Sequence, residues 1–240
     1  MKKTIITTSW DDGQPEDAKL IKLLDKYKIK ATFYIPFILK NKTVINGNKL
    51  KNYSEYCVEV GGHTINHNSL TNLPEKLALK ELVESKKRLE DILRKEIVSF
   101  SYPNGKFNKK IAHLVKMAGY NLARTTVAFK TNLKFDPFSM PVSLQFYPHT
   151  RFTHIKHALK EGNLSGLNSY ITKYNLNNDF FTLSQLILEE IMENGGIMHL
   201  WGHSWELEKY SLWGLLEKTL KSISKIKGVK YLTNGQLLVK

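Results

Sequence analysis

The sequence has little of several residue types that define large protein classes. Cys57 is the single cysteine among 240 residues, which excludes an intramolecular disulfide, a disulfide-stapled scaffold and a cysteine-based zinc site. No apolar run approaches the ~20 residues of a membrane helix. Two lysines and a few apolar residues precede Asp11 and Asp12, which is too short for the apolar segment of a secretion signal. We therefore expect a cytoplasmic protein with no membrane span.

Arginine is also scarce, although the chain is strongly basic. Lysine and arginine total 36 against 22 acidic residues, for a net charge of +14, and only four of the basic residues are arginine. Proteins that read nucleic acids favour arginine and gather basic residues on one face or tail. Here the lysines are spread over both halves of the chain. The pattern indicates a solvated basic surface and no nucleic-acid partner, and it leaves a preference for anionic substrates open.

The sequence does contain an alternation of strands and helices. Its length and 42% apolar content suffice for one domain with a substantial core. Apolar and β-branched runs predict strands at residues 4–9, 31–35, 58–60, 97–101, 121–127, 197–201 and 229–232. Helical spacing of apolar residues predicts helices at residues 15–27, 74–95, 108–118, 153–161, 182–194 and 211–225.

This order predicts an α/β fold with a parallel sheet. Strands that alternate with helices form such sheets, and seven units of this kind fit a barrel better than an open sheet. We expect a single domain over residues 1–240. Residues 128–180 are rich in Asn, Phe, Tyr and His, and we interpret them as an elaborated loop with one helix, at residues 153–161.

Reactive residue types follow the predicted strands. In parallel α/β folds, functional groups gather at the carboxyl ends of the strands. The polar residues in these places are Asp11, Asp12, His63, His67, residues 102–105 and residues 203–206, and Arg124 lies inside the predicted strand at residues 121–127. Two histidines and one aspartate form a ligand set that leaves open positions on a divalent metal, as catalytic sites do. Zinc is our first expectation, and iron, cobalt and nickel also suit these ligands. At a turn, adjacent aspartates can divide two duties, metal binding and proton acceptance.

Five short motifs in order resemble those of the NodB-homology polysaccharide deacetylases, carbohydrate esterase family 4. Residues 8–13 (Thr-Ser-Trp-Asp-Asp-Gly) are similar to the first motif, and residues 31–34 (Ala-Thr-Phe-Tyr) resemble the strand after it. Residues 59–67, with His-Thr-Ile-Asn-His at their end, are similar to the second motif. Residues 100–105 (Phe-Ser-Tyr-Pro-Asn-Gly) resemble the third and residues 200–203 (Leu-Trp-Gly-His) the fifth.

The resemblance implies a fold and a reaction. The fold is a deformed (β/α)7 barrel of the NodB type, and the reaction is metal-dependent removal of the acetyl group from an N-acetylated sugar. Carried over by position, Asp12, His63 and His67 would hold the metal, Asp11 would be the general base and His203 the general acid. Residue chemistry agrees with this assignment, because metal-activated water needs a base and the departing amine needs an acid. We expect the turn at residues 102–105 to contribute Tyr102 and Asn104, with the Asn104 N–H as an oxyanion donor.

The chain departs from the family pattern in two places. The third motif of the family normally opens with an arginine that contacts the catalytic aspartate, and Ser101 holds that place here. Arg124, in the next predicted strand, is our candidate replacement, with an outward-facing salt bridge as the alternative. The fourth motif, an aspartate with a following tryptophan, is not visible near residues 127–140; Glu206 or Asp136 is expected to orient His203 instead.

Other histidines and aromatic residues have competing interpretations. We assign Trp205 to a wall of the substrate site. His199 lies inside a predicted strand, so we expect a buried structural histidine there rather than the general acid. His149, His154 and His157 have no carboxylate close by in the sequence, and we interpret them as surface histidines rather than a second metal site.

Three functions remain open from the sequence. The first is the deacetylase, acting on an N-acetylated sugar. The second is a related metal-dependent hydrolase of a non-sugar amide, because the departures at Ser101 and the fourth motif weaken the sugar assignment. The third is a non-catalytic module that binds sugars or polyanions. Retention of both a base and an acid argues against the third, and the oligomeric state is not predicted.

Overall fold

The computed structural model describes residues 2–40, 42–44, 50, 53 and 58–238, so Cys57 lies outside the described residues. The main sheet is entirely parallel, in the order β7-β6-β5-β2-β1-β9-β8, and β10 also pairs with β1. Its strands are β1 (Thr4–Asp11), β2 (Ala31–Ile35), β5 (Val58–Gly62), β6 (Ser99–Ser101), β7 (Leu122–Arg124), β8 (Leu144–Gln145), β9 (Gly196–His203) and β10 (Val229–Tyr231). A separate antiparallel hairpin contains β3 (Ile38–Leu39) and β4 (Lys42–Thr43).

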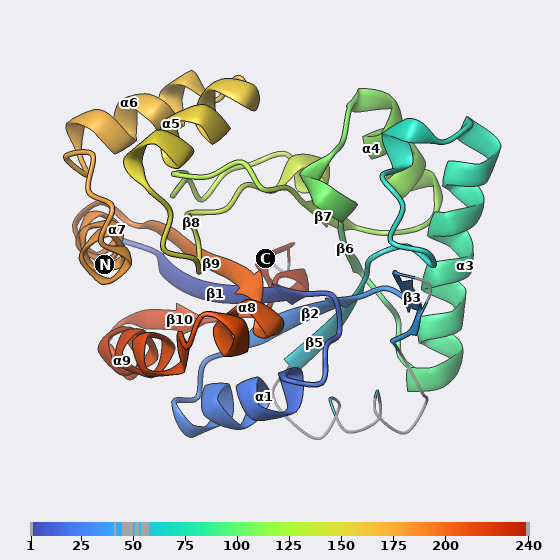
Figure 1. The fold of residues 1–240 in the computed structure, drawn as a ribbon, viewed down its shortest axis with the longest axis horizontal. Helices are drawn as coiled ribbons and strands as arrows, with labels where there is room; N and C mark the ends of the chain where they lie inside the picture. Colours follow the sequence, from blue (N-terminus) through green and yellow to red (C-terminus); the bar gives the residue numbers. More distant parts are fainter. Residues whose placement is uncertain (1, 41, 45–49, 51–52, 54–57, 239–240) are drawn as a thin grey trace.

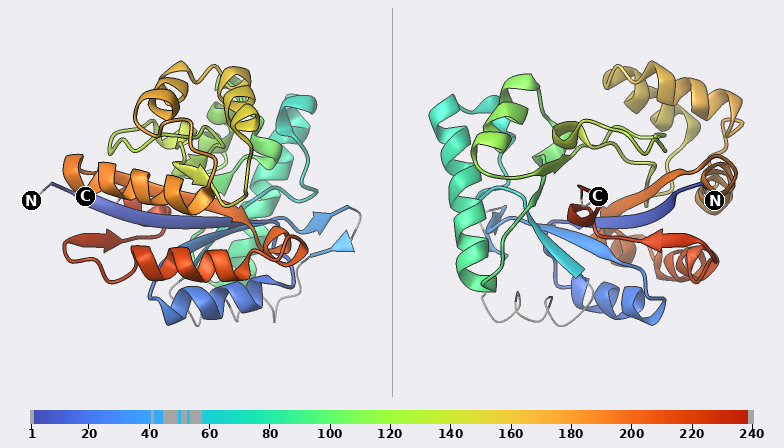
Figure 2. Two further views of the ribbon diagram at one scale, coloured as in Figure 1. Left: turned by 60° about the vertical axis from the view of Figure 1, so that its left-hand side comes forward. Right: turned by 180° about the vertical axis from the view of Figure 1, so that it is seen from behind.

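Helices surround this sheet. They are α1 (Asp17–Lys26), α3 (Glu75–Leu93), α4 (Lys109–Met117), α5 (Arg151–Lys160), α6 (Leu164–Thr172), α7 (Phe180–Asn194), α8 (Ser204–Lys209) and α9 (Trp213–Ile223). Short 3-10 turns are η1 (Leu70–Asn72), η2 (Pro103–Gly105), η3 (Pro137–Ser139) and η4 (Gly235–Leu238). In Figure 1, α1 and α9 lie below the central strands and α3 and α4 to their right. Figure 2 shows α5, α6 and α7 on the other side of β1 from α1 and α9.

The sheet curls until its two edges approach each other. Beyond β7, Arg124 forms a parallel bridge with Met140, and the Met140 N–H donates to the Ala123 carbonyl at 2.9 Å. A few residues later the Ser143 N–H donates to the His199 carbonyl at 2.9 Å. Residues 140–145 therefore run between β7 and β9. The architecture is the barrel that the alternation predicts, deformed as the family resemblance implies.

The strand β1 is central to the barrel. β9 pairs with it from Thr4 to Asp11, while β10 and β2 share its other edge. All eight residues of β1 are buried, as expected for a parallel strand covered on both faces. Alternate side chains of β1 have polar partners from distant parts of the chain: Thr7 with Asn234, Ser9 with His199, and Asp11 with Arg124.

Asn234 is hydrogen-bonded to residues of two strands in the barrel interior, β1 and β2. The Thr7 hydroxyl donates to Asn234 Oδ1 at 2.8 Å, and Asn234 Nδ2 donates to the Tyr34 hydroxyl at 2.9 Å. The Asn234 N–H donates to Thr32 Oγ1 at 2.9 Å. A buried amide side chain is stable only when such partners are present. The segment after β10 is therefore part of the core.

Residues 128–180 differ from the sequence prediction. They contain two helices, α5 and α6, together with η3 and β8, where we expected one helix. The pattern of α6 is weak because Gly166, Asn168 and Ser169 interrupt its apolar residues. The short helix α8, directly after β9, was also not predicted, and it contains Trp205 and Glu206.

Candidate active site

Asp12, His63 and His67 form a group that could hold a metal ion. One ligand atom from each lies within 4.8 Å of the others. His67 Nε2 is 3.3 Å and His63 Nε2 is 3.9 Å from Asp12 Oδ1. That oxygen is buried and has no hydrogen-bond partner among the described residues. A buried carboxylate oxygen facing two imidazole nitrogens is the donor set expected for a divalent cation.

The backbone separates the duties of the two aspartates. Asp11 ends β1 in extended conformation, whereas Asp12 has a φ of 82°. This left-handed turn lets adjacent carboxylates point to different partners, Arg124 for Asp11 and the two histidines for Asp12. His67 also has a left-handed φ, of 52°. Such backbone conformations cost energy and are concentrated at functional sites.

A hydrogen bond to the backbone orients the His63 ring. Its Nδ1 donates to the Ser101 carbonyl at 2.8 Å, which leaves Nε2 free to face Asp12. A backbone partner on one ring nitrogen is the usual way to fix a metal-binding imidazole. Burial lowers the pKa of His63 to about 4. The ring is therefore neutral at pH 7, the form that binds metal.

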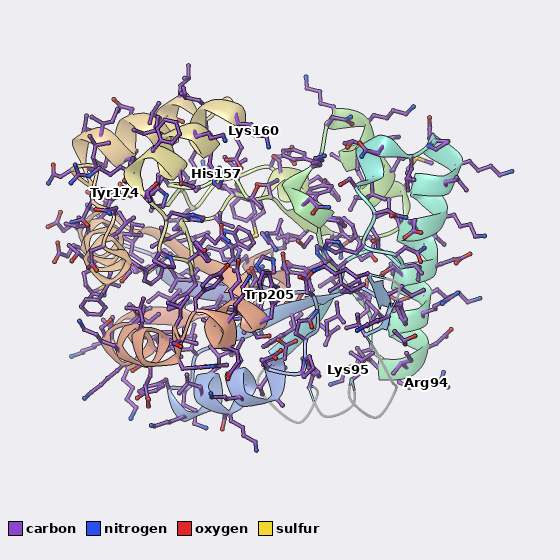
Figure 3. All side chains as sticks on the ribbon, in the orientation of Figure 1. Arg94, Lys95, His157, Lys160, Tyr174 and Trp205 are labelled. Carbon is purple, nitrogen blue, oxygen red and sulfur yellow. The ribbon has the colours of Figure 1, made fainter. Side chains whose placement is uncertain are left out.

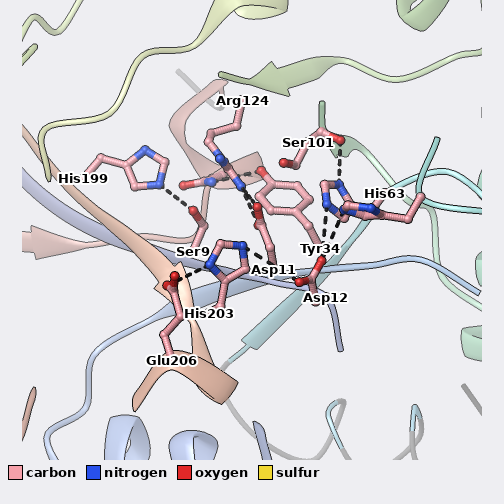
Figure 4. A network of polar contacts seen from close by, with 12 residues as sticks. Ser9, Asp11, Asp12, Tyr34, His63, Ser101, Arg124, His199, His203 and Glu206 are labelled. Carbon is pink, nitrogen blue, oxygen red and sulfur yellow. Dashed lines mark hydrogen bonds and ion pairs between the residues drawn. The ribbon is translucent and has the colours of Figure 1, made fainter. Parts of the chain in front are cut away.

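Arg124 meets Asp11, as we expected of a replacement for the missing arginine (Figure 4). Its Nη2 donates to both carboxylate oxygens, and both side chains are buried. Ser101 and Arg124 are direct partners in the pairing of β6 with β7. Burial alone would raise the pKa of Asp11, but Arg124, His63 and His203 outweigh it and hold the pKa below its usual value. Asp11 is thus kept ionised.

His203 follows β9 and faces the two aspartates. Its Nε2 is 3.9 Å from Asp12 Oδ2, and its Nδ1 bonds to Glu206 Oε2 at 2.9 Å. Burial lowers the pKa of His203, but Glu206 and the aspartates more than offset it, so the pKa lies above its usual value. Glu206 lies three residues after His203, on α8. Asp136 is engaged elsewhere, accepting from the Phe138 N–H at 2.9 Å.

One cavity of about 1680 Å³ joins these groups. Asp11, Asp12, His63, His67, Asn104, Trp201, His203 and Trp205 are among its lining residues. The indole N–H of Trp205 donates to Asp12 Oδ2 at 3.4 Å. Trp201, to which we assigned no role, packs on Arg124, with the guanidinium carbon 4.7 Å from the ring centre. Its only signal in the sequence is its place in the motif beside His203.

The expectation for Tyr102 is wrong. Its side chain is buried, and its hydroxyl donates to the Phe138 carbonyl at 2.8 Å. Its N–H donates to the Arg124 carbonyl at 3.3 Å. Both of its donors are therefore used inside the protein, and it does not line the cavity. Asn104 does line it, with a φ of 57° and a side chain that donates to Ser69 Oγ at 3.0 Å.

The remaining histidines have distinct environments. His199 is buried, with Nε2 2.8 Å from Ser9 Oγ, and burial lowers its pKa to about 3. His149, His154 and His157 line the cavity together; His157 is exposed as we expected, whereas His149 is half-buried and His154 is buried. The ring of His149 lies 5.4 Å from each of the other two. His154 is buried, and the loop before α5 brings His149 against it, which the sequence spacing did not indicate.

Comparison with known families agrees with this geometry. The family model described as polysaccharide deacetylase matches residues 1–123, which include Asp11, Asp12, His63 and His67. The chain belongs to the polysaccharide deacetylase family. A putative polysaccharide deacetylase, YxkH of Bacillus subtilis, is 27% identical over 127 residues, 52% of this chain and 45% of that protein.

This member of the polysaccharide deacetylase family is also similar to a second curated protein and to a solved structure. A peptidoglycan-N-acetylglucosamine deacetylase of Bacillus cereus is 30% identical over 119 residues, 48% of this chain and 54% of that protein. The matches thus span about half the length of the curated relatives. The crystal structure of a putative polysaccharide deacetylase from Mycobacterium smegmatis superposes with a TM-score of 0.69 at 14% identity, covering 98% of this chain and 89% of that one. This likeness extends the shared fold beyond the sequence match.

Proposed function

We propose that the protein is a metal-dependent hydrolase that removes the N-acetyl group of a sugar. The observation that carries the proposal is that one cavity contains a candidate metal group, an ionised carboxylate and a histidine paired with a glutamate. Asp12 faces two imidazole nitrogens, Asp11 is held ionised by Arg124, and His203 is held by Glu206. A metal group, a base and an acid are the three components that amide hydrolysis at neutral pH requires.

The residues fit a divalent metal. The donor set contains two imidazole nitrogens and one carboxylate oxygen, and that oxygen is buried without a hydrogen bond from the described residues. Zinc is our first candidate, with iron, cobalt and nickel as alternatives. A divalent metal in this position supplies Lewis-acid activation of water and of the acetamide carbonyl.

The side chains around this position provide the proton transfers. An ionised Asp11 accepts the proton of the attacking water on a carboxylate oxygen, while Arg124 fixes that carboxylate in place. His203, held through Nδ1 by Glu206, would donate a proton from Nε2 to the departing amine. The Asn104 N–H is our candidate donor to the oxyanion of the tetrahedral intermediate. Trp205 forms a wall against which a sugar ring can pack.

Metal analysis combined with acetate release tests the proposal. We expect the purified protein to contain about one divalent metal per chain and to release acetate from N-acetylglucosamine oligosaccharides in a chelator-sensitive manner. Asp11→Asn should retain the metal and lose activity, because it removes the base alone. His63→Ala should lose both, because it removes a ligand.

Three outcomes would contradict parts of this assignment. Loss of metal in Asp11→Asn would mean that the two aspartates have exchanged roles. Hydrolysis of non-sugar amides in preference to N-acetyl sugars would support the related hydrolase instead. A metal-free protein with no chelator-sensitive hydrolysis of any amide would exclude both enzymes. His113→Ala is the matched control, because this exposed histidine on α4 lies outside the cavity.

A further inference from the structure

Five lysines line the outer part of the active-site cavity. They are Lys40, Lys42, Lys106, Lys109 and Lys160, and we call them the lysine rim. They come from three separate parts of the chain: the β3–β4 hairpin, the segment from η2 into α4, and the end of α5. Figure 3 shows Lys160 and His157 at the end of α5 nearest the centre of the molecule, above Trp205.

Within the described part of the chain the lysine rim has no salt-bridge partner, whereas seven other lysines do. Lys26, Lys86 and Lys110 form salt bridges with Glu217, Glu90 and Glu75 at 2.5–2.8 Å. No rim lysine forms a salt bridge with a carboxylate of the described residues. All five are exposed. Their ammonium groups are therefore available to a ligand in the cavity.

The helix α4 strengthens the positive field at this rim. Its N-terminus begins at Lys109, directly after the cavity-lining Asn108, and its first turn contains no acidic residue. A helix N-terminus carries partial positive charge and normally favours carboxylates. Lysine in that place is locally unfavourable. An anionic ligand would offset both the helix dipole and the lysine charge.

The carboxylates of the cavity do not neutralise the lysine rim. Asp11 is paired with Arg124, and Asp12 belongs to the candidate metal group. Glu161 is the remaining carboxylate among the described lining residues. It follows Lys160 and accepts from Thr126 Oγ1 at 2.9 Å. Five cations thus stand against one carboxylate outside the catalytic groups.

We propose that the lysine rim selects an anionic N-acetylated glycan, in which carboxylate or phosphate groups on sugars next to the reacting one bind these lysines. The inference rests on the proposed deacetylase function and specifies its substrate class. The cavity, at about 1680 Å³, exceeds the 300–1,000 Å³ typical of small-molecule sites. Space for several sugar rings agrees with lysines that come from three separate parts of the chain rather than from one phosphate-binding loop.

The test compares charged and neutral substrates of the metal-loaded protein. Hyaluronan oligosaccharides supply carboxylates, UDP-N-acetylglucosamine supplies phosphates, and chitooligosaccharides of matched N-acetylglucosamine number are neutral. We expect kcat/KM for acetate release to be about tenfold higher on at least one anionic substrate at low salt. The advantage should shrink as sodium chloride is raised. Equal rates on charged and neutral substrates, or no dependence on salt, would overturn the inference.

A pair of charge-matched variants tests the residues themselves. Lys106→Gln/Lys109→Gln should lower the ratio of anionic to neutral kcat/KM by about tenfold. Lys22→Gln/Lys87→Gln removes the same charge from exposed positions on α1 and α3 that do not line the cavity, and it should leave the ratio unchanged. Equal effects of the two variants would mean that net charge alone draws the substrate.

Calorimetric binding separates this inference from the proposed function. If no substrate is deacetylated, the proposed function fails, yet salt-sensitive binding of an anionic sugar that weakens in Lys106→Gln/Lys109→Gln would still support the lysine rim. If neutral oligosaccharides are deacetylated and neither anionic sugar binds more tightly than they do, the lysine rim fails while the deacetylase stands.

Discussion

At the scale of single residues, the site is built from paired charges of opposite sign. Asp11 and Arg124 are both buried, and the loss of either partner would leave an uncompensated charge in the interior. The arginine comes from β7 rather than β6, yet Ser101 and Arg124 are register partners, so the guanidinium reaches the same carboxylate from one strand further along.

Arg124→Lys tests this contact while keeping the positive charge. Lysine carries its charge on a compact ammonium group and cannot pack a planar guanidinium against Trp201, so its charge should be held less firmly against Asp11 and the pKa of Asp11 should rise. The acid limb of kcat/KM should move to higher pH, because the base is protonated earlier as pH falls. We expect kcat to decrease by roughly tenfold or more, the equivalent of about 1.5 kcal/mol for one bond to a charged group.

Moving the arginine from β7 to the paired position on β6 provides the control for Arg124→Lys. Arg124→Ser should lose activity and stability, and Ser101→Arg added to it should recover part of both, because the two positions are adjacent on neighbouring strands. Thermal melts distinguish loss of folding from loss of the base. An unchanged kcat and an unchanged acid limb in Arg124→Lys would show that Arg124 has no role in catalysis.

Glu206→Gln tests how His203 is held. Without the carboxylate, the pKa of His203 should fall, since burial then acts with less opposition. The basic limb of the pH–rate profile should move to lower pH, because the acid loses its proton earlier as pH rises. Glu208→Gln is the matched control, two residues further on α8, where Glu208 contacts Lys19 at the surface. Identical pH–rate profiles for wild type and Glu206→Gln would show that Glu206 does not raise the pKa of a catalytic His203.

The positions of the site residues were predictable where a motif placed them and were not where packing placed them. The approach of Asp12, His63 and His67 was predictable because Asp12 and His63 directly follow β1 and β5 and His67 lies four residues after His63. Arg124 was inferred from the absence of arginine at Ser101. Tyr102 was misassigned because nothing in the sequence indicates that Phe138 lies against its hydroxyl.

At the scale of elements, the strands were better predicted than the segment between β7 and α7. β2 was predicted residue for residue, because β-branched and aromatic residues fill it from Ala31 to Ile35. By contrast, α6 has a polar, glycine-containing pattern, and tertiary contacts determine its helical state. The cavity wall formed by His149, His154 and His157 depends on how this segment folds back, which local periodicity does not encode.

His154 makes the stability of this wall depend on pH. Burial lowers its pKa from 6.5 to about 4, so the unfolded chain binds a proton that the folded protein excludes. Stability should therefore fall as pH decreases through this window, by about 2 kcal/mol between about pH 7.5 and pH 5. His154→Phe removes the titrating group and keeps an aromatic ring against Phe129 and Tyr170.

Denaturant unfolding at several pH values measures this effect. The free energy of unfolding of His154→Phe should depend less steeply on pH than that of the wild type. His113→Phe, at an exposed position on α4, should preserve the wild-type slope. A His154→Phe slope equal to that of the wild type would show that other groups control the acid sensitivity.

At the scale of the whole molecule, the barrel interior is joined by polar contacts between its first and last parts. Asn234→Ala should lower the free energy of unfolding by about 3 kcal/mol, because the Thr7 and Tyr34 hydroxyls would lose partners inside the core. Asn121→Ala, at an exposed position before β7, should change it by less than about 0.5 kcal/mol. Equal melting temperatures for the two variants would contradict this account.

The barrel itself was predictable from the sequence, and its interior was not. Alternating strand and helix patterns specify a parallel sheet and its handed connections. The partners of Thr7 and Ser9 could not be deduced, because Asn234 and His199 are distant in the chain and no local pattern links them.

The contact between Thr7 and Asn234 also constrains the order of folding. The two residues are 227 positions apart, so the hydrogen bond cannot form until nearly the whole barrel has been synthesised. In a nascent chain that ends before β9, one edge of β1 lacks its partner β9, and the first half of the other edge lacks β10. Such long-range closure slows folding and exposes strand edges to aggregation. We therefore expect the barrel to assemble late, in one cooperative step once the segment after β10 is available, and to need protection until then.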